Sequence, residues 1–581
     1  MTAHGVRRRL ASVPLALGGV LLATACVRMP SEGPVIEVDN AGSTTTAPGF
    51  SFDPKAPQAG ESATEIVANF LEAMKATPSG MSVAREFLTA DAQRSWTPES
   101  SIITYSEVDD PVGEQQVRLK MTSLEQYDAR GAWQGSRERQ EMVFDLTTEG
   151  GEWRIDDLPD ALIVPETWFE LQFRRMSLYF FDPTAQILVP EPVFVPTGEQ
   201  LVSSLVRGLL DDPTSDPRIT RTFVPPGFTL GLSVPITTAG IAEVSLVGDP
   251  GAVEDEARRR ILTQLIWTMR QEQRIRAVRL TIGDEDEGLT DGATTLEFGE
   301  AFDPTGALSS GDLFGLVDGL VVRGSIDSLL GTSGPMGLDR LGVRSIGVNL
   351  SGERVAGVAA NGRSVFVAPV DGEGRAVQVA SGARDLLPPA WDFADRVWLA
   401  DRAVGGAVIS VVVGEQAPRQ IDVPGVSGRD IRHLIVSRDG SRLVAVVRTP
   451  EGDRAVASRI LHSEDGRVLR AMPAVVLDFV TNDADAVIRD IGWRSPTAIS
   501  VLTDITDDLS KVATISVEGS PGDLSIVGAS SLRGGTRQLV SSPVQGTEVF
   551  AVAPQAVSDL TAPERPIDPL PARLTSLTYV G

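Results

Sequence analysis

Hydrophobic and polar positions follow three successive patterns along the 581 residues of this chain. The first is helical: Ser62 and Glu65 have the spacing of a capping box, and Ile66 and Phe70 then recur on one helical face. A second short helical segment at 83–88 precedes segments of alternating polarity at 102–105, 115–127, 137–146 and 152–155. Helices followed by antiparallel strands predict a small α+β domain over residues 62–172.

The second pattern, over residues 173–290, alternates apolar strands with longer helices. Leu201, Leu205 and Leu209 have helical spacing, and Pro213 ends that helix. Strands are expected at 177–183, 186–195, 242–247 and 278–282, and a long helix at 253–272. This order predicts a second small α+β domain.

The third pattern, over residues 291–581, consists of short apolar strands separated by glycine turns. IGVNLSGERVAGV (346–358) and LIVSRDGSRLVAV (434–446) share an apolar strand end, a polar turn closed by glycine, an arginine and an alternating strand. Related turns centre on positions 311, 352, 394, 440, 496 and 546, which are 41 to 56 residues apart. A four-stranded propeller blade needs about that much chain, so the repeat predicts a β-propeller of six blades.

Two dipeptides and the last strand add detail to this propeller. Asn361-Gly362 and Asp318-Gly319 are signals for two-residue hairpins. The strand at 574–580 is expected to pair with 313–322 in the first blade, which would leave no open edge. The predicted fold class is therefore multi-domain, with two small α+β domains followed by an all-β propeller.

The only cysteine of the chain, Cys26, follows a segment typical of a secretory signal peptide over residues 1–25. Three arginines at 7–9 precede a mainly apolar run that ends in small residues. Small residues next to a cysteine resemble the lipobox of bacterial lipoproteins. That resemblance implies cleavage before Cys26 and attachment of acyl chains such as palmitate, which would hold the protein on a membrane. Residues 26–61 are rich in Pro, Gly, Ser and Thr and read as a flexible tether.

Charge does not explain membrane attachment. The chain has 52 basic and 78 acidic residues, and its formal net charge of −26 becomes −29 once a signal with three arginines and no acidic residue is removed. Anionic lipid and nucleic acid would repel such a protein. We therefore expect no nucleic-acid partner and a lipid anchor as the link to the membrane.

Catalytic chemistry has little support in the sequence. His433 and His462 are the two histidines that remain after residue 25, and neither has a likely ligand nearby in sequence. The usual motifs of nucleophilic, zinc and nucleotide chemistry do not occur. The acidic clusters at 284–287 and at 504–508 lack the spacing of a calcium loop and are interpreted as solvated turns. We predict no catalytic residue, no metal site and no cofactor.

Tryptophans in the repeats have two interpretations. Trp391 and Trp493 stand at the same distance before the turn in two repeats, and Trp398 follows in a strand. Packing between blades is favoured over an aromatic platform for a sugar. Asn349 begins a glycosylation sequon, which has little meaning in a bacterial lipoprotein.

Several segments resemble known domains. The second domain resembles the GerMN domain in five motifs: YFFDP (179–183), LLDDP (209–213), VPPG (224–227), TQLIWTM (263–269) and VRLTIG (278–283). The first domain is similar to the NTF2-like fold in the order of its elements. The order of these segments resembles that of the actinobacterial lipoprotein LpqB family: a lipobox, a tether, an NTF2-like domain, a GerMN domain and a propeller.

This resemblance implies a non-catalytic accessory lipoprotein of the MtrA/MtrB two-component system. Such a protein would contact the extracellular domain of the sensor kinase MtrB and affect envelope integrity and cell division. Two alternatives stay open. One is a receptor that reads an envelope glycan or peptidoglycan fragment in the propeller channel. The other is an envelope hydrolase with two carboxylates at that channel, about 5 to 10 Å apart.

Overall fold

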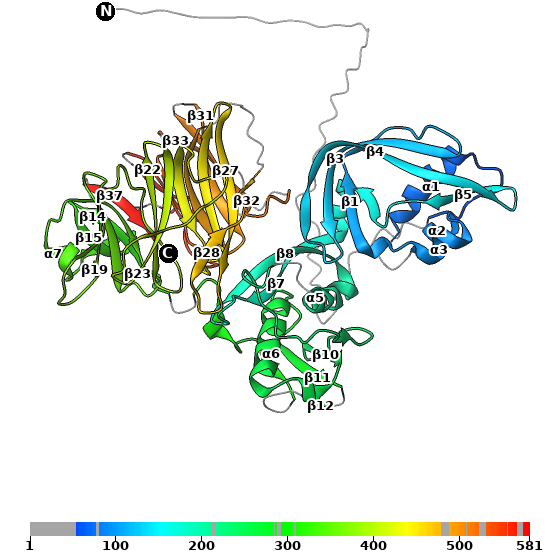
Figure 1. Ribbon diagram of the computed structural model, residues 1–581, viewed down its shortest axis with the longest axis horizontal. Coiled ribbons are helices and arrows are strands. Elements are labelled where there is room, and N and C mark those ends of the chain that lie inside the picture. The colour runs from blue at the N-terminus through cyan, green and yellow to red at the C-terminus, as the bar shows by residue number, and fades with distance from the viewer. Residues whose placement is uncertain are drawn as a thin grey trace, which may run out of the picture. The chain divides into compact units, whose positions relative to one another are not determined.

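The structure of the protein is a computed structural model that describes residues 54–581 except 77–80, 212–215, 284, 287–291, 307–308, 478–486, 507, 522–529, 555, 566 and 568–572. Figure 1 shows the chain coloured from the N-terminus to the C-terminus. The predicted signal peptide, Cys26 and the tether up to residue 53 lie outside the described residues. No helix within the described ranges is both long enough and apolar enough to cross a membrane.

The first domain combines short helices with one antiparallel-dominated sheet. Its helices are α1 (Ala63–Met74), α2 (Met81–Glu86), α3 (Ala90–Ser95) and α4 (Glu166–Gln172). Its strands are β1 (Ser101–Tyr105), β2 (Glu107–Val108), β3 (Gln116–Asp128), β4 (Trp133–Glu149), β5 (Glu152–Asp157) and β6 (Leu162–Pro165). The sheet order is β5-β4-β3-β1-β6, and the last pair, β1 and β6, is parallel.

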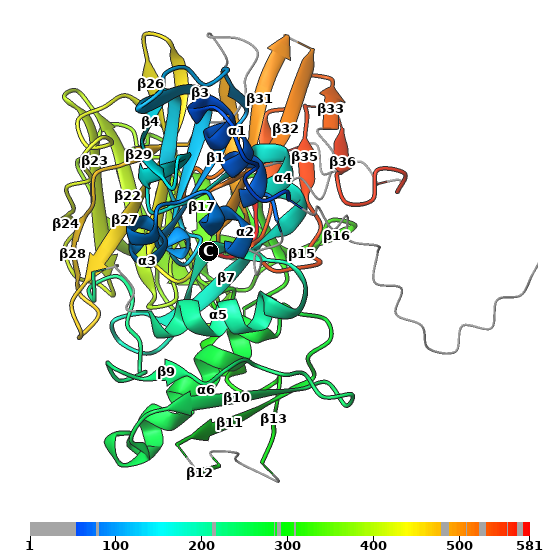
Figure 2. The same ribbon diagram turned by 90° about the vertical axis from the view of Figure 1, so that its right-hand side faces the viewer.

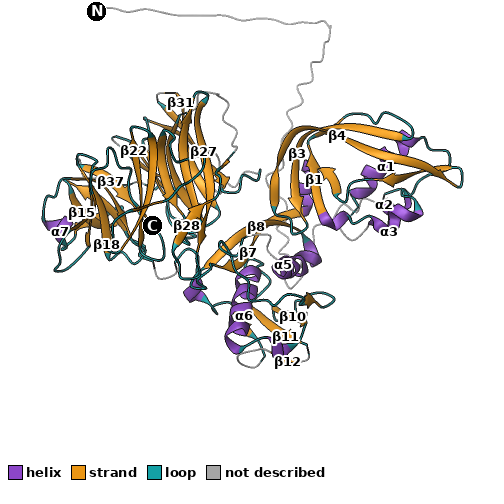
Figure 3. Ribbon diagram, in the orientation of Figure 1, coloured by secondary structure: helices purple, strands orange, loops and turns teal. Residues whose placement is uncertain are grey.

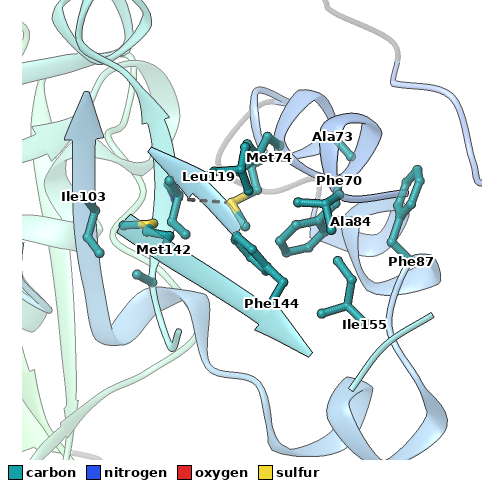
Figure 4. Close-up of a cluster of buried hydrophobic side chains, with 14 of the residues drawn as sticks. Phe70, Ala73, Met74, Ala84, Phe87, Ile103, Leu119, Met142, Phe144 and Ile155 are labelled. Atoms are coloured by element: carbon teal, nitrogen blue, oxygen red, sulfur yellow. Dashed lines mark hydrogen bonds between the residues drawn. The ribbon is translucent and has the colours of Figure 1, made fainter. Parts of the chain in front are cut away.

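The predicted capping box starts α1. The Ser62 side chain accepts a hydrogen bond from the Glu65 backbone N–H, and the Glu65 carboxylate accepts one from the Ser62 N–H. This arrangement satisfies donors that a helix start otherwise leaves free. One face of α1 then buries Phe70 and Met74 against Phe144 of the sheet (Figure 4).

The second domain contains two helices, a hairpin and a mixed sheet (Figure 2). The hairpin pairs β7 (Phe173–Phe181) with β8 (Leu188–Pro196), and the helices are α5 (Leu201–Leu210) and α6 (Asp255–Met269). The sheet contains β9 (Thr229–Leu230), β10 (Ile241–Val247), β11 (Ala277–Ile282), β12 (Glu285–Asp286) and β13 (Thr294–Thr295). Strands β10 and β11 are parallel, with α6 as the crossover between them.

Six sheets follow in the described part of the chain, in the arrangement of propeller blades. Blade 1 contains β37 (Leu574–Thr578), β14 (Leu313–Val317), β15 (Leu320–Ser325) and β16 (Ser328–Gly331); the short helix α7 (Pro335–Leu338) leads to blade 2. Blade 2 contains β17 (Val343–Val348), β18 (Arg354–Ala359), β19 (Val365–Pro369) and β20 (Val377–Ala380). Blade 3 contains β21 (Ala390–Trp391), β22 (Arg396–Ala403), β23 (Gly406–Val413) and β24 (Arg419–Gln420).

The last three blades vary more in length. Blade 4 contains β25 (Ile431–Val436), β26 (Arg442–Thr449), β27 (Gly452–His462), β28 (Val468–Ala471) and β29 (Val475–Val476). Blade 5 contains β30 (Ile488–Ser495), β31 (Ala498–Thr506), β32 (Leu509–Ser516) and β33 (Ser530–Arg533). Blade 6 contains β34 (Gln538–Val540), β35 (Phe550–Val552) and β36 (Val557–Asp559).

The C-terminal strand closes the ring, as its sequence predicts. Strand β37 pairs with β14 in the register Phe314 to Thr578 and Gly315 to Leu577, and Figure 1 shows the red β37 beside the green β14. The Gln538 side chain of blade 6 donates a hydrogen bond to the Leu577 carbonyl at 2.6 Å. The ring is therefore held at its seam by both backbone pairing and a side chain.

One of the two predicted hairpin turns has the expected length. Val317 pairs with Leu320 across Asp318-Gly319, and both turn residues have positive φ (55° and 78°), as a type I′ turn requires. At Asn361-Gly362 the prediction of a two-residue loop is wrong. The Ala359 N–H bonds the Ser364 carbonyl, so the connection contains four residues, with Gly362 alone in the left-handed region.

The predicted fold class is confirmed: two small α+β domains precede an all-β propeller. Helices occur mainly in the first two domains, and strands dominate the third (Figure 3).

Candidate functional sites at the domain junction and the propeller axis

Glu191 is a single acidic residue in the otherwise apolar strand β8, between Pro190 and Pro192. Its carboxylate accepts two hydrogen bonds from the guanidinium of Arg459 on β27, at 2.8 and 2.5 Å. Arg442 on β26 donates to the same carboxylate at 3.3 Å and to the Pro190 carbonyl at 2.7 Å. Strand β8 of the second domain is thus held on blade 4 by a partly buried cluster of charges.

Electrostatics stabilise the ionised form of this carboxylate. Burial would raise the pKa of Glu191, but the positive charges of Arg459 and Arg442 outweigh it and hold the pKa below its usual value. Arg442 is itself buried, with 3% of its surface exposed. Removing Glu191 would therefore take away the carboxylate that both arginines bind and leave Asp439, 3.9 Å from Arg442, as the remaining acidic partner of that residue.

A second ion pair across the same junction has the opposite polarity. Arg175 on β7 donates to the Glu518 carboxylate of blade 5 at 2.8 Å and to the Ser516 hydroxyl at 2.8 Å. The second domain therefore contributes one acid and one base, and the propeller contributes their partners. Reciprocal charges of this kind fix the orientation of two surfaces more than they add raw affinity.

His462, at the end of β27, lies beside this junction. Its backbone N–H donates to the Arg218 carbonyl of the second domain at 2.8 Å. Its side chain is 5% exposed, and its Nε2 atom has no hydrogen-bond partner within the described residues. Burial, and then the charge of Arg396, lower the pKa of His462 to about 3, so the imidazole is neutral at physiological pH.

A cavity of about 170 Å³ lies at the propeller axis, lined by the inner strands of the blades. His433 and Asp490 line it from neighbouring blades, with Nδ1 and Oδ1 at 3.3 Å. Trp493 and Ser541 also line it, and neither the indole Nε1 nor the hydroxyl has a hydrogen-bond partner within the described residues. Because these two atoms are themselves buried, the exposed polar part of the cavity comes from His433 and Asp490.

Arg438 lines the same cavity from the turn that follows β25. Its guanidinium donates to two carbonyls and two hydroxyls, those of Thr305, Val580, Ser309 and Ser542, at 2.6 to 3.2 Å. Burial lowers the pKa of Arg438 to about 10, which still leaves it positively charged at neutral pH. This residue joins blades 1, 4 and 6 to the segment that enters the propeller.

The two histidines are brought to different environments. His433 lines the axial cavity, and His462 lies at the domain junction. Trp391 and Trp398 are fully buried and donate hydrogen bonds to Gly347 and Asp392, so both serve packing within and between blades.

Other sequence candidates are structural. Asn349 is 2% exposed, its amide oxygen accepts from two backbone N–H groups, and its amide nitrogen donates to Asp395. A buried asparagine of this kind offers no acceptor for a glycan. Asp504 pairs with Arg489, whereas Asp507 and residues 284 and 287 lie outside the described residues.

The hydrolase hypothesis needs two carboxylates at the axis. Among the described residues that line the cavity, Asp490 is the one with a carboxylate side chain, and no group of three metal-ligating side chains occurs in the described chain.

The residues of the junction were not anticipated from the sequence. Their signal was present: Glu191 is a lone charge in an apolar strand flanked by prolines, and Arg442 occupies the arginine slot of the repeat. In the sister repeat the same slot holds Arg354, whose guanidinium lies over the Trp391 ring at 5.8 Å. Because the arginine at this position of the repeat has different partners in different blades, the repeat alone could not predict what the arginine binds.

Fold and sites together define a modular protein in which a GerMN-type domain is docked on a propeller by ion pairs. Three family models match the chain in order: the N-terminal domain of lipoprotein LpqB over residues 56–170, the sporulation and spore germination (Germane) domain over 177–287, and the lipoprotein LpqB β-propeller domain over 319–541. The chain belongs to the lipoprotein LpqB family.

Relatives cover nearly the whole chain. Lipoprotein LpqB of Thermobifida fusca is 27% identical over 90% of this chain and 91% of its own length, and that of Mycobacterium tuberculosis is 26% identical over 94% of both. Among solved structures, the first GerMN domain of the sporulation protein GerM from Bacillus subtilis is 22% identical, covers 21% of this chain and 92% of its own, and has a TM-score of 0.18.

Proposed function

We propose that the protein is a non-catalytic accessory lipoprotein of a two-component sensor kinase resembling MtrB. In this role it is anchored through Cys26 on the extracytoplasmic face of the cell membrane. It contacts the extracellular domain of the kinase and influences envelope integrity and cell division through it.

The order of the matched domains carries this proposal. The three models that match are named for lipoprotein LpqB and for sporulation and spore germination, and none is named for an enzyme. A tether of about 35 residues between a lipidated Cys26 and the first helix would keep these domains close to a membrane receptor. Such tethering raises the effective concentration of the binding surfaces, so weak contacts suffice.

The junction supports the same role. Two reciprocal ion pairs, Glu191 with Arg459 and Arg175 with Glu518, hold the GerMN domain on the propeller. A kinase domain would therefore meet one composite surface with a defined orientation, rather than two independent modules.

Binding to the extracellular domain of the cognate kinase tests this proposal directly. The mature lipidated chain and a chain that starts at residue 52 would be compared, each in solution and on lipid nanodiscs that carry the kinase domain. We expect tighter apparent binding on nanodiscs for the lipidated chain and equal binding of both chains in solution. Absence of binding in both settings would refute the proposal.

The junction variant Glu191→Gln sharpens this test. If the composite surface is recognised, this variant binds the kinase domain more weakly although each domain stays folded. The matched control is Asp91→Asn, at an ion pair with Arg94 whose two side chains are 85% and 77% exposed, far from the junction in sequence.

A further inference from the structure

No hydrophobic cluster of the described chain contains residues of both the GerMN domain and the propeller blades. The apolar core of the GerMN domain lies between its own helices and strands, and the apolar clusters of the blades contain residues from Leu313 onward. Two pockets, of about 450 and 220 Å³, are lined by residues of both parts. Protein interiors are close-packed, so this junction is not packed as a core.

Charged side chains hold the junction instead. Three positive and three negative side chains form one cluster: Arg175, Arg442, Arg459, Glu191, Asp439 and Glu518. Their charges sum to zero, and two of them, Arg175 and Glu191, come from the GerMN domain. Four of the six side chains are between 18% and 26% exposed, so ions in solution can approach the edge of the cluster.

The docked arrangement leaves polar atoms of this cluster unsatisfied. Four buried atoms have no hydrogen-bond partner within the described residues: Arg175 Nε, Arg459 Nε, Asp439 Oδ2 and Glu518 Oε2. A buried polar atom without a partner costs free energy that hydration would return. Separation of the two parts would hydrate these atoms, which offsets part of the cost of breaking the ion pairs.

The first domain and the GerMN domain, in contrast, share apolar contacts. Phe173 and Phe194 of the β7–β8 hairpin pack against the core of the first domain. The ring centroid of Phe169 lies 4.6 Å from that of Phe173 and 5.4 Å from that of Phe194. The Phe194 N–H also donates to the Gly131 carbonyl at 2.8 Å. Because screening by salt acts on charges and not on apolar burial, salt should leave these two domains together.

The chain that connects the GerMN domain to the propeller is fixed at two closely spaced points. The Phe302 ring packs edge-on against Phe181 of the GerMN domain, with 5.2 Å between centroids. The Thr305 carbonyl accepts a hydrogen bond from Arg438 of the propeller at 2.6 Å. Residues 303 and 304 alone separate these points, and hinges consist of a few such loop residues. Opening would therefore be a rotation about this short connection.

We propose that the junction is a hinge that opens as the ionic strength rises, with the first domain and the GerMN domain moving as one body about residues 303–304. Salt screens the attraction between the opposite charges, and ions associate with the charges that opening exposes, so both effects favour the open form. Trp133 of the first domain also reaches blade 5, where a Cβ atom at Gly519 would lie 3.0 Å from its ring, and this contact would separate as well. The hinge does not depend on the proposed contact with a kinase.

Förster resonance energy transfer in the mature lipidated chain, kept in detergent, tests this hinge. Dyes on Glu199→Cys of the GerMN domain and Glu451→Cys of blade 4 report on the junction, and both positions are exposed. Dyes on Glu138→Cys and Glu199→Cys report on the first two domains, and the wild type shows whether Cys26 takes up dye. We expect the open-to-closed ratio at the junction to rise about tenfold between about 0.05 and 1 M NaCl. Sucrose of equal osmolality should leave it unchanged.

Glu191→Gln links the transition to the charge cluster. It should lower the salt concentration at the midpoint about twofold or more, because the closed form loses the carboxylate that Arg442 and Arg459 bind. Asp91→Asn should leave the midpoint unchanged, and Glu518→Gln replaces Glu191→Gln if that variant does not fold. An unchanged junction signal up to 1 M NaCl, an equal change between the first two domains, the same change in sucrose, or equal midpoints for the cluster variant and the control would overturn the proposal.

Discussion

Glu191 of the GerMN domain and Arg459 of propeller blade 4 form a bidentate ion pair, in which Nη1 donates to Oε2 and Nη2 donates to Oε1. Arg442 donates to the same carboxylate from the neighbouring strand. Because this cluster joins segments about 250 to 270 residues apart, it couples the stability of one domain to the placement of the other.

Glu191→Gln should strongly destabilise this junction. Glutamine keeps the shape of the side chain but removes the negative charge that binds Arg442 and Arg459. Because this pair is only partly buried and Asp439 remains 3.9 Å from Arg442, we expect a loss of about 1.5–3 kcal/mol. Urea unfolding monitored by circular dichroism should show the loss, and limited proteolysis should show faster cleavage between the two domains. Asp91→Asn, at a well-exposed pair, should change the free energy of unfolding by less than about 1 kcal/mol. Equal effects of the two substitutions would contradict the role of the cluster.

Leu577→Ala should weaken closure of the propeller ring. Leu577 is 1% exposed on the terminal strand and pairs with Gly315 of blade 1. Truncating a buried leucine costs about 2–5 kcal/mol, since a cavity remains. The exposed neighbour Thr575 is the control, and Thr575→Ala should change the free energy of unfolding by about 0.5 kcal/mol or less. Thermal unfolding followed by circular dichroism would compare the two variants, and a stable Leu577→Ala protein would show that the seam is held elsewhere.

The strand pattern of the propeller could be predicted because each blade repeats the same local chemistry. Ring closure by 574–580 could be predicted as well, since an unpaired first blade would leave an open edge. The turn at Asp318-Gly319 followed from local conformational preference, whereas the turn at Asn361-Gly362 did not, because the pairing of Ala359 with Ser364 set a longer loop.

The candidate sites were largely hidden from the sequence. The partners of Glu191 lie more than 250 residues away, and no local pattern shows which arginine a lone glutamate meets. Trp391 and Trp493 share a position in the repeat, yet a neighbouring blade supplies a carbonyl to Trp391, whereas no described residue accepts from the Trp493 indole N–H. Residues at the same position of the repeat therefore differ in role because their contacts with the neighbouring blades differ.

Stability should fall on mild acidification because of His462. The folded-state pKa of about 3 lies below the value of about 6.5 for an unfolded histidine, so the unfolded chain binds a proton that the folded chain excludes. Above about pH 6.5, His462 does not lower the free energy of unfolding. As the pH falls from about 6.5 toward 3, it lowers that free energy by up to about 1.4 kcal/mol per pH unit. Urea unfolding of the wild type and His462→Gln at pH 7, 6 and 5 checks this. The difference between the two proteins should change with pH, and parallel curves would exclude the histidine as the cause.

Cys26→Ala should abolish lipid attachment. With a formal net charge of −26 before processing, the protein has no electrostatic attraction to anionic lipid, so acyl chains on this residue are the expected anchor. Mass spectrometry of the wild type purified from membranes should find an N-terminal peptide that begins at Cys26 and carries acyl chains, and fatty-acid labelling should be absent from Cys26→Ala. Ser31→Ala, five residues further along the tether, should retain both the label and the mass. A wild-type N-terminal peptide without lipid, or one that begins at another residue, would refute the anchor and remove the tethering on which weak binding to a membrane kinase depends.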